Sequence, residues 1–296
     1  MGLELKNVSK TYSGKKVVDN ISFSLNQPGV YGLLGTNGAG KTTTIRMLLG
    51  IIKKDCGEIT WNGKKVDRKN VNFGYLPEER GVYQKTVIFN QLMFFAELKG
   101  MNKKDAEKSI KRWAKELKVE EYIYKTAEKL SKGNQQKIQL MTALIHDPEL
   151  IVLDEPFSGL DPVNTDLIKN IIINLVKEGK YIIMSAHQMH TIEEFCSDIL
   201  ILNKGKTVLK GNLQEIKNTY PANRLKLQAN GDIENFIKDS KLKVENKVND
   251  VYSIFINSED EARNLLKNLV KANIDVDIFE IMKPTLNDIF VEKVGE

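Results

Sequence analysis

The chain has 296 residues and a mass of 33.6 kDa, with 41% hydrophobic and 28% charged residues. This length allows one large domain or a large domain with a small one, and the composition is typical of a folded protein rather than a disordered one. The net charge of +5 requires neither a membrane nor a nucleic-acid partner, and two distant cysteines exclude a disulfide framework.

The N-terminal residues alternate apolar and polar side chains in two stretches, 3–12 and 17–25, which predicts half-buried strands. A hairpin is predicted at 58–66, where Asn62 and Gly63 supply the two positive-φ positions of a type I′ turn. Together these segments predict a small antiparallel β subdomain.

A phosphate-binding pattern lies between these hairpins. A short apolar strand at 30–34 leads into a glycine-rich loop and then into a helix at 42–49, which Gly50 ends. From residue 86 to about 118, apolar residues recur at helical spacing with lysines on the opposite face. This pattern predicts an insert of two or three helices.

The segment after residue 130 alternates between helical and strand patterns. We predict helices at 131–145, 166–177 and 191–196, and strands at 150–153, 181–185 and 199–202. Such alternation is typical of a parallel sheet covered by helices.

The C-terminal segment carries no phosphate-handling motif. Beyond residue 220 we predict strands at 224–229, 251–256 and 275–281, and helices at 232–237 and 259–271. These elements predict a small α+β domain over residues 221–296, separate from the domain at 1–220.

Residues 35–42 read Gly-Thr-Asn-Gly-Ala-Gly-Lys-Thr between the predicted strand and helix. The glycines let successive backbone N–H groups point at a phosphate, with the positive end of the helix behind them. Lys41 is predicted to neutralise the β- and γ-phosphates, and Thr42 to offer its hydroxyl to Mg²⁺. A glycine-rich turn without a ligand is the alternative, and an eight-residue match in this context disfavours it. The predicted nucleotide-binding residues here are Gly35, Thr36, Asn37, Gly38, Ala39, Gly40, Lys41, Thr42 and Thr43.

The strand at 150–153 runs into the acidic pair Asp154-Glu155. Nucleotide hydrolysis requires a carboxylate for the metal ion and a group that orients or deprotonates the attacking water. Asp154 is predicted to bind Mg²⁺, directly or through its water shell, and Glu155 to polarise the water. The alternative is an exposed strand end that happens to carry acids.

A third motif, Leu130-Ser-Lys-Gly-Asn-Gln-Gln136, opens a predicted helix just before this strand. With these three motifs, the sequence resembles the nucleotide-binding subunit of ATP-binding cassette (ABC) transporters over roughly residues 1–220. The resemblance implies an α/β fold of the P-loop NTPase class, with a parallel sheet core, an antiparallel β subdomain and a helical subdomain at about 86–130. A small C-terminal α+β domain follows.

The resemblance also implies roles for particular residues. His187 matches the switch histidine that contacts the γ-phosphate, and Tyr12 matches an aromatic residue that stacks on adenine, although a lone tyrosine is more often a strand residue. His146 and His190 are expected to be surface or packing residues. Contacts to the ATP of a second cassette are implied for Ser131, Gly133 and Gln135, and a loop across the dimer interface for Ser158, Gly159, Leu160 and Asp161.

Three positions depart from the family pattern. Glu78 stands where the family usually has a glutamine that senses Mg²⁺. A carboxylate there could still approach the metal, but it adds negative charge near the phosphates. The alternative is that Glu78 is only solvated. Lys132 and Asn134 are milder departures, because Ser131 and Gly133 are retained.

The resemblance implies an ATPase that requires Mg²⁺ and dimerises with a second copy or a homologous cassette. Such a subunit powers a separate membrane permease, and loop sequences resemble the sodium-extrusion and drug-export cassettes. No nucleic acid is expected as a partner. Because no run of 18 apolar residues occurs, we expect that the chain does not itself cross a membrane. The resemblance implies peripheral attachment to the cytoplasmic face of the membrane through the permease. Two alternatives remain: a soluble ABC ATPase acting on ribosomes or DNA, and an ATP-binding regulatory subunit with weak hydrolysis.

Overall fold

The computed structural model describes residues 2–66, 71–79, 81–187 and 189–295. The chain divides into two compact units, Met1–Gly211 and Asn212–Glu296. The division falls before helix α7 (Leu213–Thr219), whereas the sequence pattern places it at residue 220.

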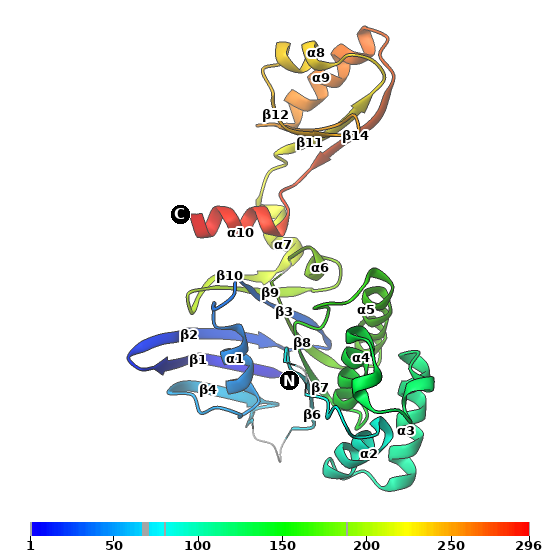
Figure 1. Cartoon of the computed structure of the whole chain (residues 1–296). Coiled ribbons are helices and arrows are strands. Elements are labelled where there is room, and N and C mark those ends of the chain that lie inside the picture. Colours follow the sequence, from blue (N-terminus) through cyan, green and yellow to red (C-terminus); the bar gives the residue numbers. More distant parts are fainter. Residues whose placement is uncertain (1, 67–70, 80, 188, 296) are drawn as a thin grey trace. The chain divides into compact units, whose positions relative to one another are not determined.

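A six-stranded sheet forms the centre of the first unit, in the order β10-β9-β3-β8-β7-β6 (Figure 1). Strands β3, β8, β7, β6 and β9 are parallel wherever they pair. Both β3 and β7 are buried along their whole length, as continuous apolar strands covered on both faces are. The parallel sheet predicted from the sequence is therefore confirmed. Its strands are β3 (Gly29–Gly35), β6 (Phe73–Leu76), β7 (Leu150–Asp154), β8 (Tyr181–Ala186), β9 (Asp198–Asn203) and β10 (Lys206–Asn212).

A second, antiparallel sheet has the order β2-β1-β4-β5. Its strands are β1 (Leu3–Tyr12), β2 (Lys15–Leu25), β4 (Cys56–Trp61) and β5 (Lys64–Lys65). The turn between β4 and β5 has Asn62 at φ 51° and Gly63 at φ 76°, the positive values of a type I′ turn. The predicted antiparallel subdomain is confirmed.

Helix α1 (Lys41–Leu48) packs between the two sheets, and its buried residues Ile45 and Leu48 join both in one core. That core combines the inward residues of β1 and β2 with one face of the parallel sheet. A shared core of this kind fixes the loop before α1 between two rigid layers.

The remaining helices of the first unit include the predicted insert, α2 (Ile88–Leu98) and α3 (Lys103–Glu116), followed by α4 (Lys132–Leu144), α5 (Pro162–Lys177) and α6 (Met189–Glu193). Two boundaries differ from the sequence prediction. Helix α5 begins at Pro162 rather than residue 166, because Asp161 caps it by accepting from the Asn164 N–H and proline is tolerated in the first turn. Helix α6 is also displaced, since it begins before residue 191 and ends before residue 196.

The second unit contains the order β11 (Arg224–Ala229), α8 (Glu234–Asp239), β12 (Lys243–Val248), β13 (Val251–Phe255), α9 (Glu259–Lys271) and β14 (Val276–Met282), followed by α10 (Leu286–Gly295). The sheet order β12-β13-β11-β14 with this βαββαβ sequence is that of ferredoxin-like domains. Its core lies between the sheet and the helices α8 and α9. The predicted α+β character is confirmed, and β12 and α10 are additions to the predicted elements.

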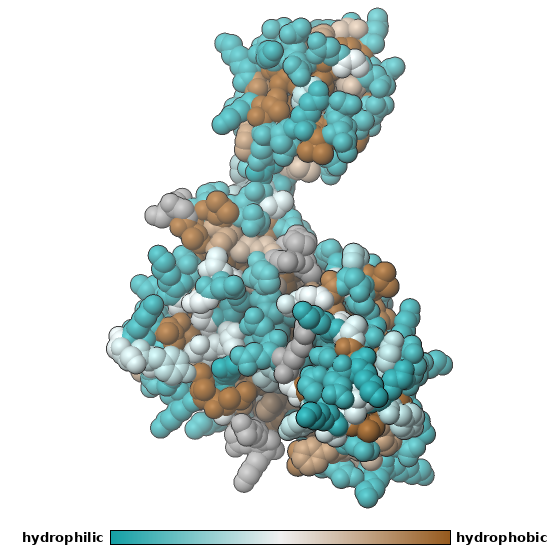
Figure 2. All heavy atoms as spheres, viewed as in Figure 1, coloured by the Kyte–Doolittle hydropathy of each residue, from teal (hydrophilic) through white to brown (hydrophobic). Residues whose placement is uncertain are grey.

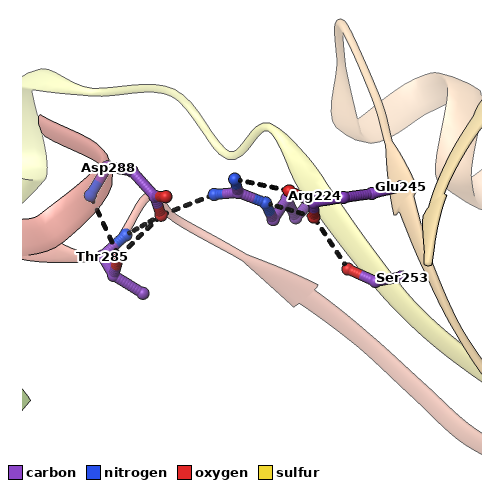
Figure 3. A network of polar contacts seen from close by, with 5 residues as sticks. All are labelled: Arg224, Glu245, Ser253, Thr285 and Asp288. Atoms are coloured by element: carbon purple, nitrogen blue, oxygen red, sulfur yellow. Dashed lines mark hydrogen bonds and ion pairs between the residues drawn. The ribbon is translucent and has the colours of Figure 1, made fainter. Parts of the chain in front are cut away.

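An ionic network in the second unit joins its sheet to α10 (Figure 3). Arg224 donates to both carboxylate oxygens of Glu245 on β12, at 2.9 and 3.1 Å, and to Oδ2 of Asp288 in the first turn of α10, at 2.5 Å. The same Asp288 oxygen accepts from the backbone and the hydroxyl of Thr285. Arg224 therefore holds the start of α10 against the sheet.

On the face shown in Figure 2, hydrophilic side chains predominate in each unit, with separate hydrophobic patches among them. Within the ranges that the structure describes, no helix has the length and apolar character needed to cross a bilayer.

Candidate functional site

The predicted phosphate loop, Asp154, Glu155 and His187 lie at one edge of the parallel sheet, where its strands end. Asp154 at the end of β7 lies opposite Ser185 on β8, and Leu34 on β3 lies opposite Ala186. Because neighbouring parallel strands share this carboxyl edge, the loops that follow β3, β7 and β8 meet there. This edge is the usual ligand-binding edge of open α/β sheets.

The glycine-rich loop between β3 and α1 depends on close backbone approach. Gly35 has φ 147°, and a Cβ there would lie 2.3 Å from the Leu202 carbonyl oxygen. Gly40, at φ 106°, caps α1, and a Cβ there would lie 2.6 Å from the Val17 carbonyl oxygen. Neither position accepts a side chain without movement of the backbone. The loop thus places N–H groups and the positive helix end at the same point.

Lys41 is buried at the start of α1. Its Nζ donates to the carbonyl oxygens of Gly35 at 2.8 Å and Thr36 at 3.3 Å, and lies 3.8 Å from Glu155 Oε1. The ammonium group is therefore held inside the loop, beside the acid at the end of β7. A lysine so placed supplies positive charge where phosphates would bind.

Asp154 is 1% exposed, and its Oδ1 accepts from the Ser185 hydroxyl. Its Oδ2 is buried and has no hydrogen-bond partner among the described residues. Burial raises the pKa of Asp154, the Ser185 hydrogen bond lowers it, the negative charges of Glu78 and Glu155 raise it, and the nearby Thr42 hydroxyl lowers it. A buried carboxylate oxygen without a donor is costly, and a bound cation would satisfy it.

A cavity of about 410 Å³ lies beside Asp154 and is lined also by Thr42, Tyr75 and Glu78. Glu78 is exposed, two residues beyond β6. Among the described residues no cluster of three His, Cys, Asp or Glu side chains could hold a metal. Mg²⁺ in nucleotide sites needs no such cluster, because one or two carboxylates act together with phosphates. The donor set of Asp154, Thr42 and Glu78 fits that pattern.

Glu155 follows β7 in a left-handed conformation, with φ 53°. Its Oε2 lies 2.8 Å from His187 Nδ1, while Oε1 faces Lys41. Glu155 is nearly buried, whereas the His187 side chain is 46% exposed. The carboxylate is therefore positioned between a fixed cation and a ring that reaches solvent.

The segment before β7 begins α4 with Ser131 as its N-cap, whose hydroxyl accepts from the Asn134 N–H at 3.3 Å. Ser131 is exposed, and Gly133 lies within the first turn. The Gln135 side chain is buried and donates to the carbonyl oxygens of Ala127 and Leu130. In this conformation Gln135 supports the loop that presents Ser131, and its predicted contact with a second nucleotide remains a prediction.

The loop after Glu155 carries the residues predicted to cross a dimer interface. Ser158 and Gly159 are exposed, and Asp161 caps α5. A cavity of about 430 Å³ is lined by this loop together with Glu155 and His187. The exposed loop and the acid thus share one hollow.

Three further predicted residues lie on the surface. Thr36 and Asn37 are exposed at the tip of the glycine-rich loop. Tyr12 is 46% exposed at the end of β1, with Lys10 Nζ 5.2 Å from its ring centroid. An exposed ring in this position is available for stacking. The stacking role itself remains a prediction.

His146 is a packing residue, as expected from the sequence. It is 9% exposed, its Nε2 lies 3.0 Å from the Phe73 carbonyl oxygen, and burial lowers its pKa to about 4. The side chain of His190 lies outside the described part of the structure.

Sequence reasoning missed three polar residues that support the site. Ser185 is fully buried beside Asp154. Gln136 donates to the Pro156 carbonyl oxygen, and Gln139 donates to the carbonyl oxygens of Pro77 and Glu79. A polar residue inside an otherwise apolar strand or helix face was the available signal, because such groups require partners when buried.

Comparisons with known proteins agree on one family. Residues 18–158 match the family described as ABC transporter, and residues 211–294 match that described as ATP-binding protein DrrA1-3-like, C-terminal domain. The chain is 41% identical over 294 residues to YhaQ of Bacillus subtilis, an uncharacterized ABC transporter ATP-binding protein, covering 99% of this chain and 98% of YhaQ.

Two further similarities each cover about three quarters of the chain. The chain is 30% identical over 221 residues to LptB of Escherichia coli, the ATP-binding protein of a lipopolysaccharide export system, covering 72% of this chain and 92% of LptB. A solved structure described as the ATP binding subunit of an ABC transporter is similar with a TM-score of 0.69 at 29% identity, covering 74% of this chain and 93% of that chain.

Proposed function

Because the chain belongs to the ATP-binding subunits of ABC transporters, we propose that it hydrolyses ATP with Mg²⁺ as one of two cassettes that power transport through a separate membrane permease. The observation that carries this proposal is the meeting of Lys41, Asp154 and Glu155 at one sheet edge. A phosphate loop, a metal carboxylate and a general base are the parts that hydrolysis needs.

The chain binds the triphosphate through the loop 35–42 and the start of α1. Its backbone N–H groups donate to phosphate oxygens, and Lys41 exchanges its bonds to Gly35 and Thr36 for bonds to phosphate. Thr43 bonds the α-phosphate from the first turn of α1. Tyr12 stacks on the adenine ring.

Asp154 and Thr42 would hold the metal ion, with Glu78 at the rim of the same cavity. When bound, Mg²⁺ neutralises charge on the phosphates and orients them for displacement. Asp154 offers Oδ2, because Oδ1 is occupied by Ser185. The negative charge of Glu78 tunes the metal affinity of this pair.

Glu155 accepts the proton of the attacking water. His187 holds Glu155 at 2.8 Å and contacts the γ-phosphate from its exposed side. A base fixed from two sides keeps its orientation during proton transfer. Lys41 lies close enough to Glu155 that phosphate binding and alignment of the base are coupled.

The cassette is completed by a second copy or a homologous cassette. Ser131 and Gly133 are presented at the exposed start of α4, where a helix N-terminus suits a γ-phosphate. For Gln135 to join the same contact, its amide would exchange its bonds to the Ala127 and Leu130 carbonyl oxygens for the nucleotide. The loop from Ser158 to Asp161 lies at the interface, next to the base. Dimerisation thereby becomes part of catalysis.

The helical insert at about 86–130 passes motion to the permease, which holds the chain at the cytoplasmic face of the membrane. Export is the proposed direction, because LptB is named for an export system. A second candidate, a regulatory subunit that binds ATP but hydrolyses it slowly, is favoured only by Glu78 beside Asp154.

The test is a measurement of phosphate release by the purified full chain, together with identification of membrane proteins that co-purify with it. We expect hydrolysis that requires Mg²⁺ and a partner with several apolar spans. Tight ATP binding without turnover, alone or with the partner, would favour the regulatory subunit. Recovery of ribosomes or DNA instead of a membrane protein would contradict the transport assignment.

A further inference from the structure

Ser185 is a fully buried polar residue that the proposed mechanism does not use directly. It lies at the carboxyl end of β8, opposite Asp154 on β7. Its hydroxyl donates to Asp154 Oδ1 and accepts from the Glu155 N–H at 3.1 Å. A serine hydroxyl has one donor, and here that donor is committed to Asp154. One hydroxyl thus joins two consecutive acidic residues.

The first consequence concerns the orientation of Asp154. A carboxylate can rotate so that either oxygen faces a cation, because its terminal torsion has a broad minimum. The bond from Ser185 fixes Oδ1 and leaves Oδ2 as the buried oxygen without a partner. Asp154 also lines the cavity that contains Thr42 and Glu78. Ser185 therefore selects the oxygen that remains available for the cation.

The second consequence concerns the backbone of Glu155. This residue has φ 53°, a region that non-glycine residues rarely adopt without local support. Its N–H donates to both the hydroxyl and the carbonyl oxygen of Ser185, at 3.1 and 3.3 Å. The left-handed turn directs the carboxylate toward His187 and Lys41. The hydroxyl of Ser185 is one of the two anchors of that turn.

We propose that Ser185 is a positioning residue for ATP hydrolysis, which orients the metal carboxylate of Asp154 and fixes the turn that places the base Glu155. This inference rests on the proposed function. It assigns to β8 a part in the site beyond carrying His187, and it links the metal contact and the base through one shared hydroxyl.

The test compares three variants of the full chain. Ser185→Ala removes the hydroxyl, Ser185→Thr keeps it, and Ser185→Cys keeps the volume with a thiol that is only a weak donor and acceptor. Two quantities are measured by calorimetry and phosphate release: the gain in ATP affinity that Mg²⁺ produces over EDTA, and kcat. Affinity for ATP in EDTA reports the phosphate loop alone and should stay within about twofold of wild type, since the side-chain hydrogen bonds of Ser185 in the described structure go to Asp154 and Glu155 rather than to that loop.

We expect Ser185→Ala and Ser185→Cys to lower kcat by about 10- to 100-fold, the range for losing a hydrogen bond to a charged group, and to reduce the Mg²⁺-dependent gain in affinity. Ser185→Thr should restore both quantities. The matched control is Ser22→Ala. Its hydroxyl likewise accepts from a backbone N–H and donates to a side-chain oxygen, both of Asn7, a residue at φ 50° on the antiparallel sheet.

Ser22→Ala should leave kcat and the Mg²⁺ gain unchanged, and thermal unfolding of every variant shows whether the fold is retained. The assignment is overturned if folded Ser185→Ala keeps both quantities within twofold of wild type, or if folded Ser185→Thr loses them as Ala does. A wild-type chain that does not hydrolyse ATP under any condition overturns the proposed function and this inference with it. Hydrolysis by wild type with an unaffected Ala variant overturns this inference alone.

Discussion

Replacing Glu155 by glutamine tests the proposed chemistry most directly, because the amide has the same shape but cannot accept the proton. Glu155 is 7% exposed, with Oε2 2.8 Å from His187 Nδ1 and Oε1 3.8 Å from Lys41 Nζ. The amide can occupy this space and still bond to His187. We expect ATP hydrolysis to fall by about 10²- to 10⁴-fold, the usual contribution of a general base, which corresponds to about 2.7–5.4 kcal/mol in the activation barrier.

The assay is steady-state phosphate release, followed by size-exclusion chromatography with and without ATP. If the nucleotide joins two cassettes, slow hydrolysis should trap an ATP-bound dimer of the Glu155→Gln chain, whereas wild type should dissociate after turnover. The control is Glu149→Gln, an exposed carboxylate just before the same strand. Hydrolysis within threefold of wild type in Glu155→Gln would refute the assignment of the base.

Three further predictions concern other parts of the chain. Glu78→Gln should retain hydrolysis and change the Mg²⁺ concentration for half-maximal rate by about threefold or more, because a charge beside Asp154 is removed. An unchanged dependence of the rate on Mg²⁺ concentration would mean that Glu78 is only solvated. Burial lowers the pKa of His146 to about 4, so the unfolded chain binds a proton more readily than the folded one. The free energy of unfolding should therefore fall as the pH drops from about 6.5 toward 4, by about 2 kcal/mol at pH 5. Denaturant unfolding of His146→Gln should lose this slope, and a slope equal to that of wild type would contradict the reasoning. Arg224→Ala removes the ion-pair partner of Glu245 and Asp288. This change should reduce the hydrogen-exchange protection of α10 by about 1–3 kcal/mol after allowance for partial exposure. The control Arg263→Ala breaks an exposed pair with Glu259 and should change that protection by less than about 0.5 kcal/mol. Equal effects of the two arginine substitutions would show that the network does not hold α10.

The elements predicted well from the sequence are those in which local signals agree. The segment from β3 through the glycine-rich loop to α1 combines an apolar strand, required glycines and a helix that Gly50 ends at φ 67°. Helix α9 has a serine cap and three acids in its first turn, and its predicted bounds agree with the structure. In both cases burial, capping and backbone requirements favour the same conformation, so no distant contact is needed to decide it.

The elements that the sequence did not reveal depend on distant partners. Strand β12 is exposed along its whole length, and its Lys-Val-Glu-Asn-Lys-Val sequence carries charges that are common on edge strands, so it has no buried face to produce a clear pattern. Its hydrogen bonds to β13 and the contact of Glu245 with Arg224 hold it in place. Ser185 was missed for a similar reason, because its partner Asp154 is distant in sequence and becomes its neighbour only when β7 and β8 pair.

Helix α4 shows how one element joins the separate parts of the site. Its start presents Ser131, Gln136 donates to the Pro156 carbonyl oxygen just after Glu155, and Gln139 donates to the carbonyl oxygens on either side of Glu78. Both glutamines are about 5% exposed, so water does not readily replace these bonds if they break. A displacement of α4 must therefore carry the segments at Glu78 and Pro156 with it or lose buried hydrogen bonds. Since Glu78 shares a cavity with Asp154 and Pro156 follows Asp154 by two residues, any contact that moves the exposed end of α4 also acts on the residues around the metal carboxylate.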